Sequence, residues 1–553
     1  MKASDLLVRC LDAEGIRYVF GVPGEENADV MMSLEDSGIT FVLTRHEQGA
    51  AFMAEVHGRL TGEPAVALGT LGPGATNLLT GVADANMDRS PMLVLTGQGA
   101  TTRLHKESHQ VMDVVGMYEP ITKWAQSVRH AANIPEIVRK AVRIALTEKP
   151  GACLIELPED IAEHDVDVDA EPITPMKFRR PVPDDKIVDQ AWAAIQAAER
   201  PIILAGNGTI RRRASKQLRL FVERTGIGVV STFMAKGCVD MDDERCLFTI
   251  GLQARDHPVR AIELADLVIT LGYDMVEYHP RLWNPEGDKS IVHMDFLPAE
   301  VDERYDVDVE VVGDLAHTLW MLNERCWRGS TTDAHWDHSH TRAARKAMLE
   351  DFASYADDDA VGAIKPQKAL WDARQVLGPD DVLLSDVGAH KMWVARYYQC
   401  HEPNTCLIPN GFCSMGFALP GAIAASMLYP DRRILAVCGD GGFLMNVQEM
   451  ETCVRIGAHP VVMVWEDGGY GLIAWKQENE FGRHTDLAFG NPDWVQLAEA
   501  FGWRGVRVER SADLAGALED GFGSGQPTLV AVPIDYRENL LLTERLGQID
   551  ETI

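Results

Sequence analysis

Short apolar runs rich in β-branched residues alternate with longer stretches of helical periodicity along almost all of the 553 residues. Units of strand, helix and second parallel strand produce this alternation, because parallel strands need a long crossover that is usually helical. The pattern therefore predicts an α/β protein built on doubly wound parallel sheets. The expected strands cover residues 17–21, 40–44, 65–68, 92–95, 152–157, 201–205, 267–271, 290–294, 382–385, 434–437, 460–465 and 528–532.

Two stretches interrupt the alternation and divide the chain into three parts. The first carries an acidic run followed by four prolines, and the second combines a Gly-Ser-Thr-Thr sequence with a charged segment and three successive aspartates. Such compositions bury little apolar surface and disfavour regular elements, as linkers do. We expect three α/β domains of similar size, which cover residues 1–165, 186–325 and 366–553.

The charge of the chain excludes two classes of partner. It has 52 Lys and Arg against 83 Asp and Glu, a formal charge of −31. That charge repels nucleic-acid phosphates and anionic lipid surfaces, so we expect neither nucleic acid nor a membrane as a partner. The N-terminus carries charged residues where a secretory signal would be apolar, and the ten cysteines form no CxxC pair. These features predict a cytoplasmic protein with reduced thiols.

Two glycine turns follow strands expected in the third domain. Asp440 lies in the sequence Gly-Asp-Gly-Gly after one strand, and Asp467 precedes Gly468-Gly469 after the next. If these parallel strands are neighbours, their ends lie ~5 Å apart, close enough for both carboxylates to bind one Mg²⁺. Two turn-forming Asp-Gly sequences are the alternative explanation. Asn446 and Glu449 have the spacing of a capping pair at the start of the following helix.

A second group of motifs lies in the first domain. Arg45-His46-Glu47-Gln48 passes directly from a strand into a helix, which places Glu47 near the carboxyl edge of the sheet, where α/β proteins bind ligands. The sequence Gly-Pro-Gly-Ala-Thr-Asn at 72–77 follows another strand in the same manner. Taken alone, Glu47 is better explained as a charge that stabilises a helix N-terminus.

Together these motifs resemble the thiamine diphosphate-dependent enzymes, and within them the acetolactate synthases. The resemblance rests on Gly-Asp-Gly with a polar residue 27 positions later, on Arg-His-Glu, on the 72–77 motif and on Asn-Gly-Phe-Cys-Ser-Met-Gly at 410–416. It implies a pyrimidine-binding N-terminal domain, a central Rossmann-like domain and a C-terminal diphosphate-binding domain, with thiamine diphosphate and Mg²⁺ as cofactors. In this family the site forms between the first domain of one subunit and the third of another, which implies a homodimer or homotetramer.

The resemblance also assigns roles to residues. Glu47 would hydrogen-bond N1′ of the aminopyrimidine, the carbonyl of Cys413 would receive the 4′-amino group, and Met415 would bend the cofactor, although Met is more often core filler. Asp440, Asp467 and the carbonyl of Gly469 would bind Mg²⁺. The residues expected to contact the cofactor are Pro23, Gly24, Glu47, Pro73, Asn77, Gly388, His390, Cys413, Met415, Gly439, Asp440, Gly441, Gly442, Asn446, Asp467 and Gly469.

Three residues are expected near the substrate. His109-Gln110 resembles a pair that lies beside the substrate and the thiazolium in flavin-free members, so Gln110 joins Glu47 and Met415 as an expected catalytic residue. Lys476 occupies a position that faces the second 2-oxo acid and that is Gln in the catabolic members. A lysine there could attract a carboxylate or extend into solvent.

The middle of the chain bears on the flavin. Residues 272–284, Gly-Tyr-Asp-Met-Val-Glu-Tyr-His-Pro-Arg-Leu-Trp-Asn, resemble the corresponding stretch of the catabolic, flavin-free acetolactate synthases. Flavin-containing biosynthetic members carry a Gly-Ala-Arg-Phe-Asp-Asp-Arg-like sequence there, with an arginine aligned with Tyr278. Asp467 agrees, because biosynthetic members have Asn at that position. FAD is therefore not expected.

The resemblance implies that the chain decarboxylates one pyruvate and joins the remainder to a second, giving 2-acetolactate and CO₂. Another thiamine diphosphate-dependent 2-oxo acid decarboxylase or carboligase, with a different donor or acceptor, stays open, as does a biosynthetic enzyme with a regulatory subunit. A non-catalytic paralogue kept for assembly is a further alternative, which the presence of Glu47, Asp440 and Asp467 argues against.

Overall fold

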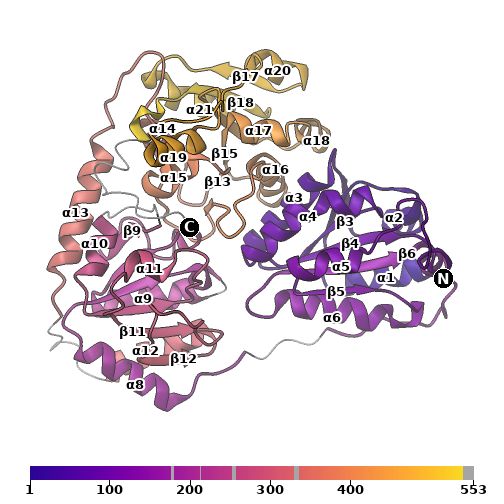
Figure 1. Ribbon diagram of the computed structural model, residues 1–553, viewed down its shortest axis with the longest axis horizontal. Coiled ribbons are helices and arrows are strands. Elements are labelled where there is room, and N and C mark those ends of the chain that lie inside the picture. Colours follow the sequence, from indigo (N-terminus) through magenta and orange to yellow (C-terminus); the bar gives the residue numbers. More distant parts are fainter. Residues whose placement is uncertain (176–179, 212, 252–256, 329–335, 540–553) are drawn as a thin grey trace.

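The computed structural model describes residues 1–175, 180–211, 213–251, 257–328 and 336–539. They form three six-stranded sheets, each flanked by helices (Figure 1). All pairs of neighbouring strands in these sheets are parallel, so the expected α/β class is confirmed. The expected third domain extends over residues 540–553, which lie outside the described part. No helix within the described ranges has the length and apolar character needed to cross a bilayer.

The first domain is built on a sheet of order β2-β1-β3-β4-β6-β5. The sequence does not predict β5, Trp124–Ser127, because its residues are only half-buried at the edge of the sheet and form no apolar run. The other strands are β1 Tyr18–Gly21, β2 Thr40–Leu43, β3 Ala65–Gly69, β4 Met92–Gln98 and β6 Ala152–Pro158. The helices are α1 Ala3–Ala13, α2 Ala28–Glu35, α3 Glu47–Thr61, α4 Pro73–Met87, α5 Val114–Tyr118, α6 Ile134–Leu146 and α7 Glu159–Ala162.

The central domain has the strand order β12-β11-β10-β7-β8-β9. Its strands are β7 Pro201–Ala205, β8 Gly228–Ser231, β9 Cys246–Thr249, β10 Leu267–Leu271, β11 Ser290–Asp295 and β12 Val309–Val312. Its helices are α8 Asp185–Ala197, α9 Ala214–Thr225, α10 His257–Glu263, α11 Pro280–Trp283 and α12 Leu315–Arg328, and α13 Ser339–Ala353 leads toward the third domain.

The third domain has the order β14-β13-β15-β16-β18-β17. Its strands are β13 Val382–Ser385, β14 Cys406–Leu407, β15 Ile434–Gly439, β16 Val461–Glu466, β17 Arg504–Arg507 and β18 Thr528–Pro533. Its helices are α14 Pro366–Val376, α15 Ala389–Tyr397, α16 Ala418–Leu428, α17 Asp440–Met445, α18 Glu449–Ile456, α19 Gly471–Phe481, α20 Trp494–Ala500 and α21 Leu514–Gly523.

The first and third sheets share one topology. When the strands of each are numbered from its own start, both have the order 2-1-3-4-6-5, whereas the central sheet has the order 6-5-4-1-2-3. Ligands of open α/β sheets bind beyond the carboxyl ends of the strands, at points where the strand order reverses. The two outer domains therefore present equivalent edges for a ligand.

A continuous apolar core joins the first domain to the third. Helix α16 lies beside α3 (Figure 1), and buried residues of both helices belong to the same hydrophobic cluster. The ring of Phe52 on α3 meets that of Phe417 edge-on, with 5.8 Å between centroids. Burial of this joint surface stabilises the arrangement of the two domains as well as each domain by itself.

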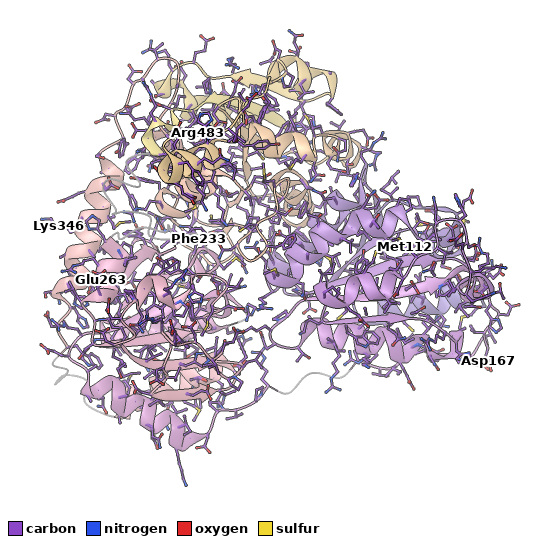
Figure 2. The ribbon with its side chains drawn as sticks, in the orientation of Figure 1. Met112, Asp167, Phe233, Glu263, Lys346 and Arg483 are labelled. Carbon is purple, nitrogen blue, oxygen red and sulfur yellow. The ribbon has the colours of Figure 1, made fainter. Side chains whose placement is uncertain are left out.

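The central domain is also anchored to the third. Phe233 follows β8 and lies where the two domains meet (Figure 2), within the buried cluster of the third domain. The ammonium group of Lys391 on α15 lies 5.4 Å from the centroid of the Phe233 ring. The three domains thus pack through side chains as well as through the connecting segments.

Gly81 offers a test of the close contact between α3 and α4. A Cβ atom at Gly81 would lie 2.5 Å from Cβ of Ala51, a contact that only a separation of the helices relieves. We expect Gly81→Ala to lower the free energy of unfolding by about 1–3 kcal/mol, measured by urea denaturation. The matched control is Gly516→Ala on the exposed face of α21, where nothing lies within 4 Å. It should be neutral or slightly stabilising; equal stability of the two variants would contradict the packing described.

Candidate active site

Asp440 and Asp467 lie side by side at the carboxyl edge of the third sheet. Strands β15 and β16 are parallel neighbours with Gly439 opposite Trp465, so the expected adjacency of the two strands is confirmed. Asp440 is 1% exposed, and its Oδ2 accepts the N–H of Asp467 at 3.2 Å and that of Gly468 at 2.7 Å. Asp467 is exposed, yet partial desolvation of its carboxylate, followed by the charge of Asp440, raises its pKa to about 7. A divalent cation would neutralise this pair of mutually repelling carboxylates.

Asn491, which the sequence analysis does not single out, completes this corner. Its Nδ2 donates to Oδ2 of Asp440 at 2.7 Å, while its Oδ1 is buried and has no hydrogen-bond partner among the described residues. A buried amide oxygen without a donor is uncommon, and amide oxygens are ligands for hard cations. Sequence reasoning misses Asn491 because it lies 51 residues from Asp440, in a segment without regular structure.

The backbone of Gly468 and Gly469 forms a fixed turn beside the aspartates. Gly468 has a φ of +70°, a left-handed conformation that favours glycine. Its carbonyl accepts the N–H of Phe489 at 2.9 Å, and Tyr470 N–H donates to the carbonyl of Leu487 at 3.2 Å. These contacts fix the backbone on both sides of Gly469, whose carbonyl is the expected third metal ligand.

The glycines after β15 pack closely against residues that follow β13. A Cβ atom at Gly439 would lie 3.1 Å from the ring of His390, and one at Gly442 would lie 3.2 Å from the carboxylate of Asp386. His390 is buried with its Nε2 unpartnered, and burial lowers its pKa to about 3, so the imidazole is neutral. A neutral imidazole with a free ring nitrogen can donate to a phosphate oxygen. This corner gathers Gly388, His390, Gly439, Gly441 and Gly442, five of the residues expected to contact the cofactor.

The end of the 410–416 loop is fixed to the same corner. Gly416 N–H donates to Oδ1 of Asp386 at 2.8 Å, and its carbonyl accepts from Nδ2 of Asn446 at 2.7 Å. Burial raises the pKa of Asp386 to about 6. Met415, the expected apolar wedge, is half-buried directly before Gly416. Asp386 is a further residue that sequence reasoning misses.

Cys413 lies in the same loop in a strained backbone conformation. Its φ is +60°, which is uncommon for a residue with a side chain. Lys391 Nζ lies 2.9 Å from Cys413 Sγ and 3.2 Å from Oδ1 of Asn410. The loop that contains the expected cofactor contacts is therefore tied to α15.

The expected capping pair of Asn446 and Glu449 is wrong. The glycine turn itself begins a helix, since α17 starts at Asp440, and Asn446 is the residue that follows its end. Helix α18 begins at Glu449 without a side-chain cap from Gln448. The side chains of Asn446 and Glu449 bond other segments instead, because partners distant in sequence compete successfully for them.

Glu47 lies in the first turn of α3, where His46 is the N-cap. It is 7% exposed, and its Oε2 accepts from Nδ2 of Asn77 at 2.9 Å. A Cβ atom at Gly74 would lie 3.4 Å from its Oε1, so the 72–77 motif packs against the carboxylate. The structure thus brings together Glu47, Pro73 and Asn77, three of the expected cofactor contacts.

Pro23 and Gly24 follow β1 on the same edge of the first sheet. A Cβ atom at Gly24 would lie 2.4 Å from Oγ1 of Thr70, two residues before the 72–77 motif, so only glycine fits there. Gly24 N–H donates to Oδ1 of Asn27 at 2.8 Å, which fixes the turn. Pro23 is exposed.

Glu449 connects the first domain to the third within one chain. Its Oε1 accepts the N–H of Arg45 at 3.1 Å and that of His46 at 3.0 Å, directly before Glu47. Within the described part of the chain, however, no hydrogen bond or ion pair joins Glu47 to Asp440 or Asp467.

The expected substrate residues occupy two places. His109 and Gln110 are exposed, and Gln110, with a φ of +57°, lies against the 72–77 motif, since a Cβ atom at Gly72 would be 2.9 Å from Cβ of Gln110. Lys476 is half-exposed on α19, which begins just after Gly469 and Tyr470, and it forms no ion pair among the described residues. The structure thus places Gln110 against the 72–77 motif, which also contacts Glu47, and Lys476 on the helix that follows the Asp467 turn.

Comparisons with known proteins agree with this arrangement. Models of the thiamine pyrophosphate enzymes match three regions: the N-terminal TPP binding domain matches residues 1–117, the central domain 188–322 and the C-terminal TPP binding domain 386–532.

Curated relatives match nearly the whole chain. The acetolactate synthase of Bacillus subtilis (strain 168) is 35% identical over 553 residues, which cover 98% of this chain and 94% of that protein. The catabolic acetolactate synthase of Raoultella terrigena is 36% identical over 548 residues, with 99% and 97% covered. A probable acetolactate synthase large subunit of Methanocaldococcus jannaschii is 32% identical over 570 residues, with 100% and 95% covered. The chain therefore belongs to the thiamine pyrophosphate enzymes, within the acetolactate synthase family.

Proposed function

We propose that this chain is a thiamine diphosphate- and Mg²⁺-dependent acetolactate synthase that converts two molecules of pyruvate into 2-acetolactate and CO₂. The observation that carries the proposal is that this chain contains two groups of the expected site residues and aligns over nearly its whole length with named acetolactate synthases. The Glu47 group comprises Glu47, Pro73 and Asn77, and the Asp440 group comprises Asp440, Asp467 and Gly469. Thiamine diphosphate supplies the carbon nucleophile and the electron sink for loss of CO₂.

The metal site uses the residues at the ends of β15 and β16. Asp440, Asp467 and the carbonyl of Gly469 provide the oxygen ligands that Mg²⁺ prefers, and the unpartnered Oδ1 of Asn491 is a further oxygen beside them. His390, Asn446 and the glycines 388, 441 and 442 would hold the diphosphate. These residues fit a cation because the charge of the buried Asp440 carboxylate raises the pKa of the neighbouring Asp467, a repulsion that a bound cation would remove.

Glu47 is the residue that activates the cofactor. Asn77 fixes its Oε2 at 2.9 Å, which leaves Oε1 for a ring nitrogen of the aminopyrimidine. The low exposure of Glu47 keeps water away from that hydrogen bond and strengthens it. Met415 and the carbonyl of Cys413 orient the cofactor from the third domain, while Gln110 and His109 lie on the substrate side.

The active unit is a homodimer or a homotetramer. In the family that the sequence resembles, the site forms between the first domain of one subunit and the third domain of another, so each chain supplies one half of two shared sites. A two-fold pairing of the first domain of one subunit with the third domain of another completes both sites at once.

The central domain supports independence from flavin. The N–H of Asn207, in the glycine turn after β7, donates to the carboxylate of Glu277 at 2.9 Å, and Thr232 also donates to that carboxylate. The nearby cations are likewise engaged, since Arg89 and Lys149 pair with Asp274. Glu277 therefore occupies the donors that a dinucleotide phosphate would need.

The ten cysteines are free thiols, as in a protein of the reducing cytoplasm, where we place this enzyme.

Lys476 favours a substrate or acceptor that carries a carboxylate, and pyruvate satisfies this as donor and as acceptor. A decarboxylase that releases an aldehyde is the alternative that product analysis separates.

The test of the proposed reaction is product analysis with pyruvate, thiamine diphosphate and Mg²⁺, with no flavin added. We expect 2-acetolactate and CO₂, and a Glu47→Gln variant that keeps its thermal unfolding midpoint but loses at least about 100-fold in rate. Glu136→Gln, on the exposed face of α6, is the matched control and should retain full activity. Acetaldehyde as the main product would contradict the carboligase, and full activity of Glu47→Gln would contradict the role of Glu47.

Removal of the metal tests the site at β15 and β16. Dialysis against EDTA should abolish retention of thiamine diphosphate, and Mg²⁺ should restore it.

We expect Asp467→Ala to raise the Mg²⁺ concentration at half-saturation by about 10- to 100-fold, because one of two carboxylate ligands is lost. Asp486→Ala, an exposed aspartate between β16 and Asn491, is the control and should leave the Mg²⁺ dependence unchanged. An unchanged dependence in Asp467→Ala would place the metal elsewhere.

A further inference from the structure

Three acidic side chains are buried together where the first domain meets the 410–416 loop. Glu55 on α3, Asp84 on α4 and Asp88 just after α4 are 0%, 0% and 2% exposed. One oxygen of each lies within 4.8 Å of the others. Arg59, one turn after Glu55, places its Nη1 3.1 Å from Oδ2 of Asp88 and 3.8 Å from Oε1 of Glu55. We call Glu55, Asp84 and Asp88 the acidic triad.

The acidic triad holds backbone N–H groups of the loop. Asp88 accepts from Gly411 at 2.7 Å and from Asn410 at 3.2 Å. Oδ1 of Asp84 accepts from Ser414 at 3.1 Å. Ser414 lies between Cys413 and Met415, and Asn410 and Gly411 begin the same loop. The first domain therefore fixes the part of the third domain that contacts the cofactor in the proposed function.

The charges of the acidic triad do not balance if all three groups are ionised. Arg59 supplies the only cation in contact with it among the described residues, and helix α16, which also packs on α3, has no charged side chain. Asp88 has three donors, but both oxygens of Glu55 and Oδ2 of Asp84 are buried without a hydrogen-bond partner. A buried carboxylate without donors is strongly unfavourable.

One proton between Glu55 and Asp84 removes both problems. It supplies the missing donor and cancels one negative charge. Burial, followed by the charges of Asp84 and Asp88, raises the pKa of Glu55 well above its ordinary value, and burial raises that of Asp84 to about 8. Since the two carboxyl groups interact, the proton belongs to the pair.

We propose that Glu55 and Asp84 share one proton and that the acidic triad, with Arg59, positions the 410–416 loop for the cofactor. This proposal rests on the proposed function, because it takes that loop as part of the cofactor site. Loss of the proton at alkaline pH makes Glu55 repel Asp84 and Asp88 and loosens the loop, so affinity for thiamine diphosphate falls. Glu55, Asp84, Asp88 and Arg59 are positioning residues, since they act through the loop.

The protein without cofactor gives the first test, through Glu55→Gln. The amide keeps the shape of Glu55 and donates to Asp84 without a titrating proton. Infrared spectroscopy should show the carbonyl stretch of a protonated carboxyl group in the wild type, and that band should be lost in Glu55→Gln.

The pH dependence of stability tests the same proton. An unfolded Glu releases its proton near its ordinary pKa of about 4.3, whereas the folded pair retains it. Folded protein thus binds more protons above that pH, and the free energy of unfolding falls as pH rises until the pair is ionised. This fall should be smaller in Glu55→Gln.

Binding of thiamine diphosphate with Mg²⁺, followed by calorimetry from about pH 6 to about pH 9, gives the second test. Wild-type affinity should fall several-fold at the alkaline end, while Glu55→Gln should stay nearly constant. Glu14→Gln, which alters a buried carboxylate directly after α1 that pairs with Arg139, should follow the wild type. Asp84→Asn, which keeps an acceptor for Ser414, should resemble Glu55→Gln.

Three results would overturn the proposal: the same alkaline loss in Glu55→Gln as in the wild type, absence of the carboxyl band, or elemental analysis that finds a second cation per chain which both amide variants release. None of these measurements requires catalytic turnover. If they give the expected results while the product of the enzyme is not 2-acetolactate, only the proposed reaction is contradicted.

Discussion

Parallel pairing of β15 with β16 is the constraint on which the site depends. It sets two strand ends side by side, so Asp440 and Asp467 must share one corner, where Asp440 accepts the N–H groups of Asp467 and Gly468. The glycines of the same turn leave room for His390 and Asp386, and Asp386 in turn fixes the 410–416 loop. The proposed metal and diphosphate site thus depends on the register of two strands.

Buried carboxylates join the first domain to the third, and they reach across the boundary in both directions. Glu449 binds the backbone before Glu47, and Asp84 and Asp88 bind the backbone of the 410–416 loop. Each of these contacts crosses between domains that also share an apolar core around α3 and α16. Charge-assisted hydrogen bonds to backbone N–H groups are directional, so they set the relative position of the two halves more finely than apolar contact alone.

Much of this could be predicted from the sequence, where the signal is local. The alternation of strands and helices predicts the α/β class, and the spacing of Asp440 and Asp467 predicts neighbouring strand ends. The half-buried edge strand β5 gives no such signal. Asn446 and Glu449 have the spacing of a cap, but segments 30 and more than 400 residues away compete for their side chains. Asn491 and Asp386 become visible only through tertiary contacts. Glu55 and Asp84 look like surface charges of helices until the loop that buries them is placed.

The central claim is that the Glu47 group of one subunit and the Asp440 group of another form one site. Two differently tagged inactive variants, Glu47→Gln and Asp440→Ala, can be co-expressed and the mixed dimers purified. A mixed dimer contains one site in which both residues are intact, so about half of the wild-type activity per dimer should return. Mixed dimers as inactive as the two parents would contradict the claim, because they would place both groups in a site within one chain.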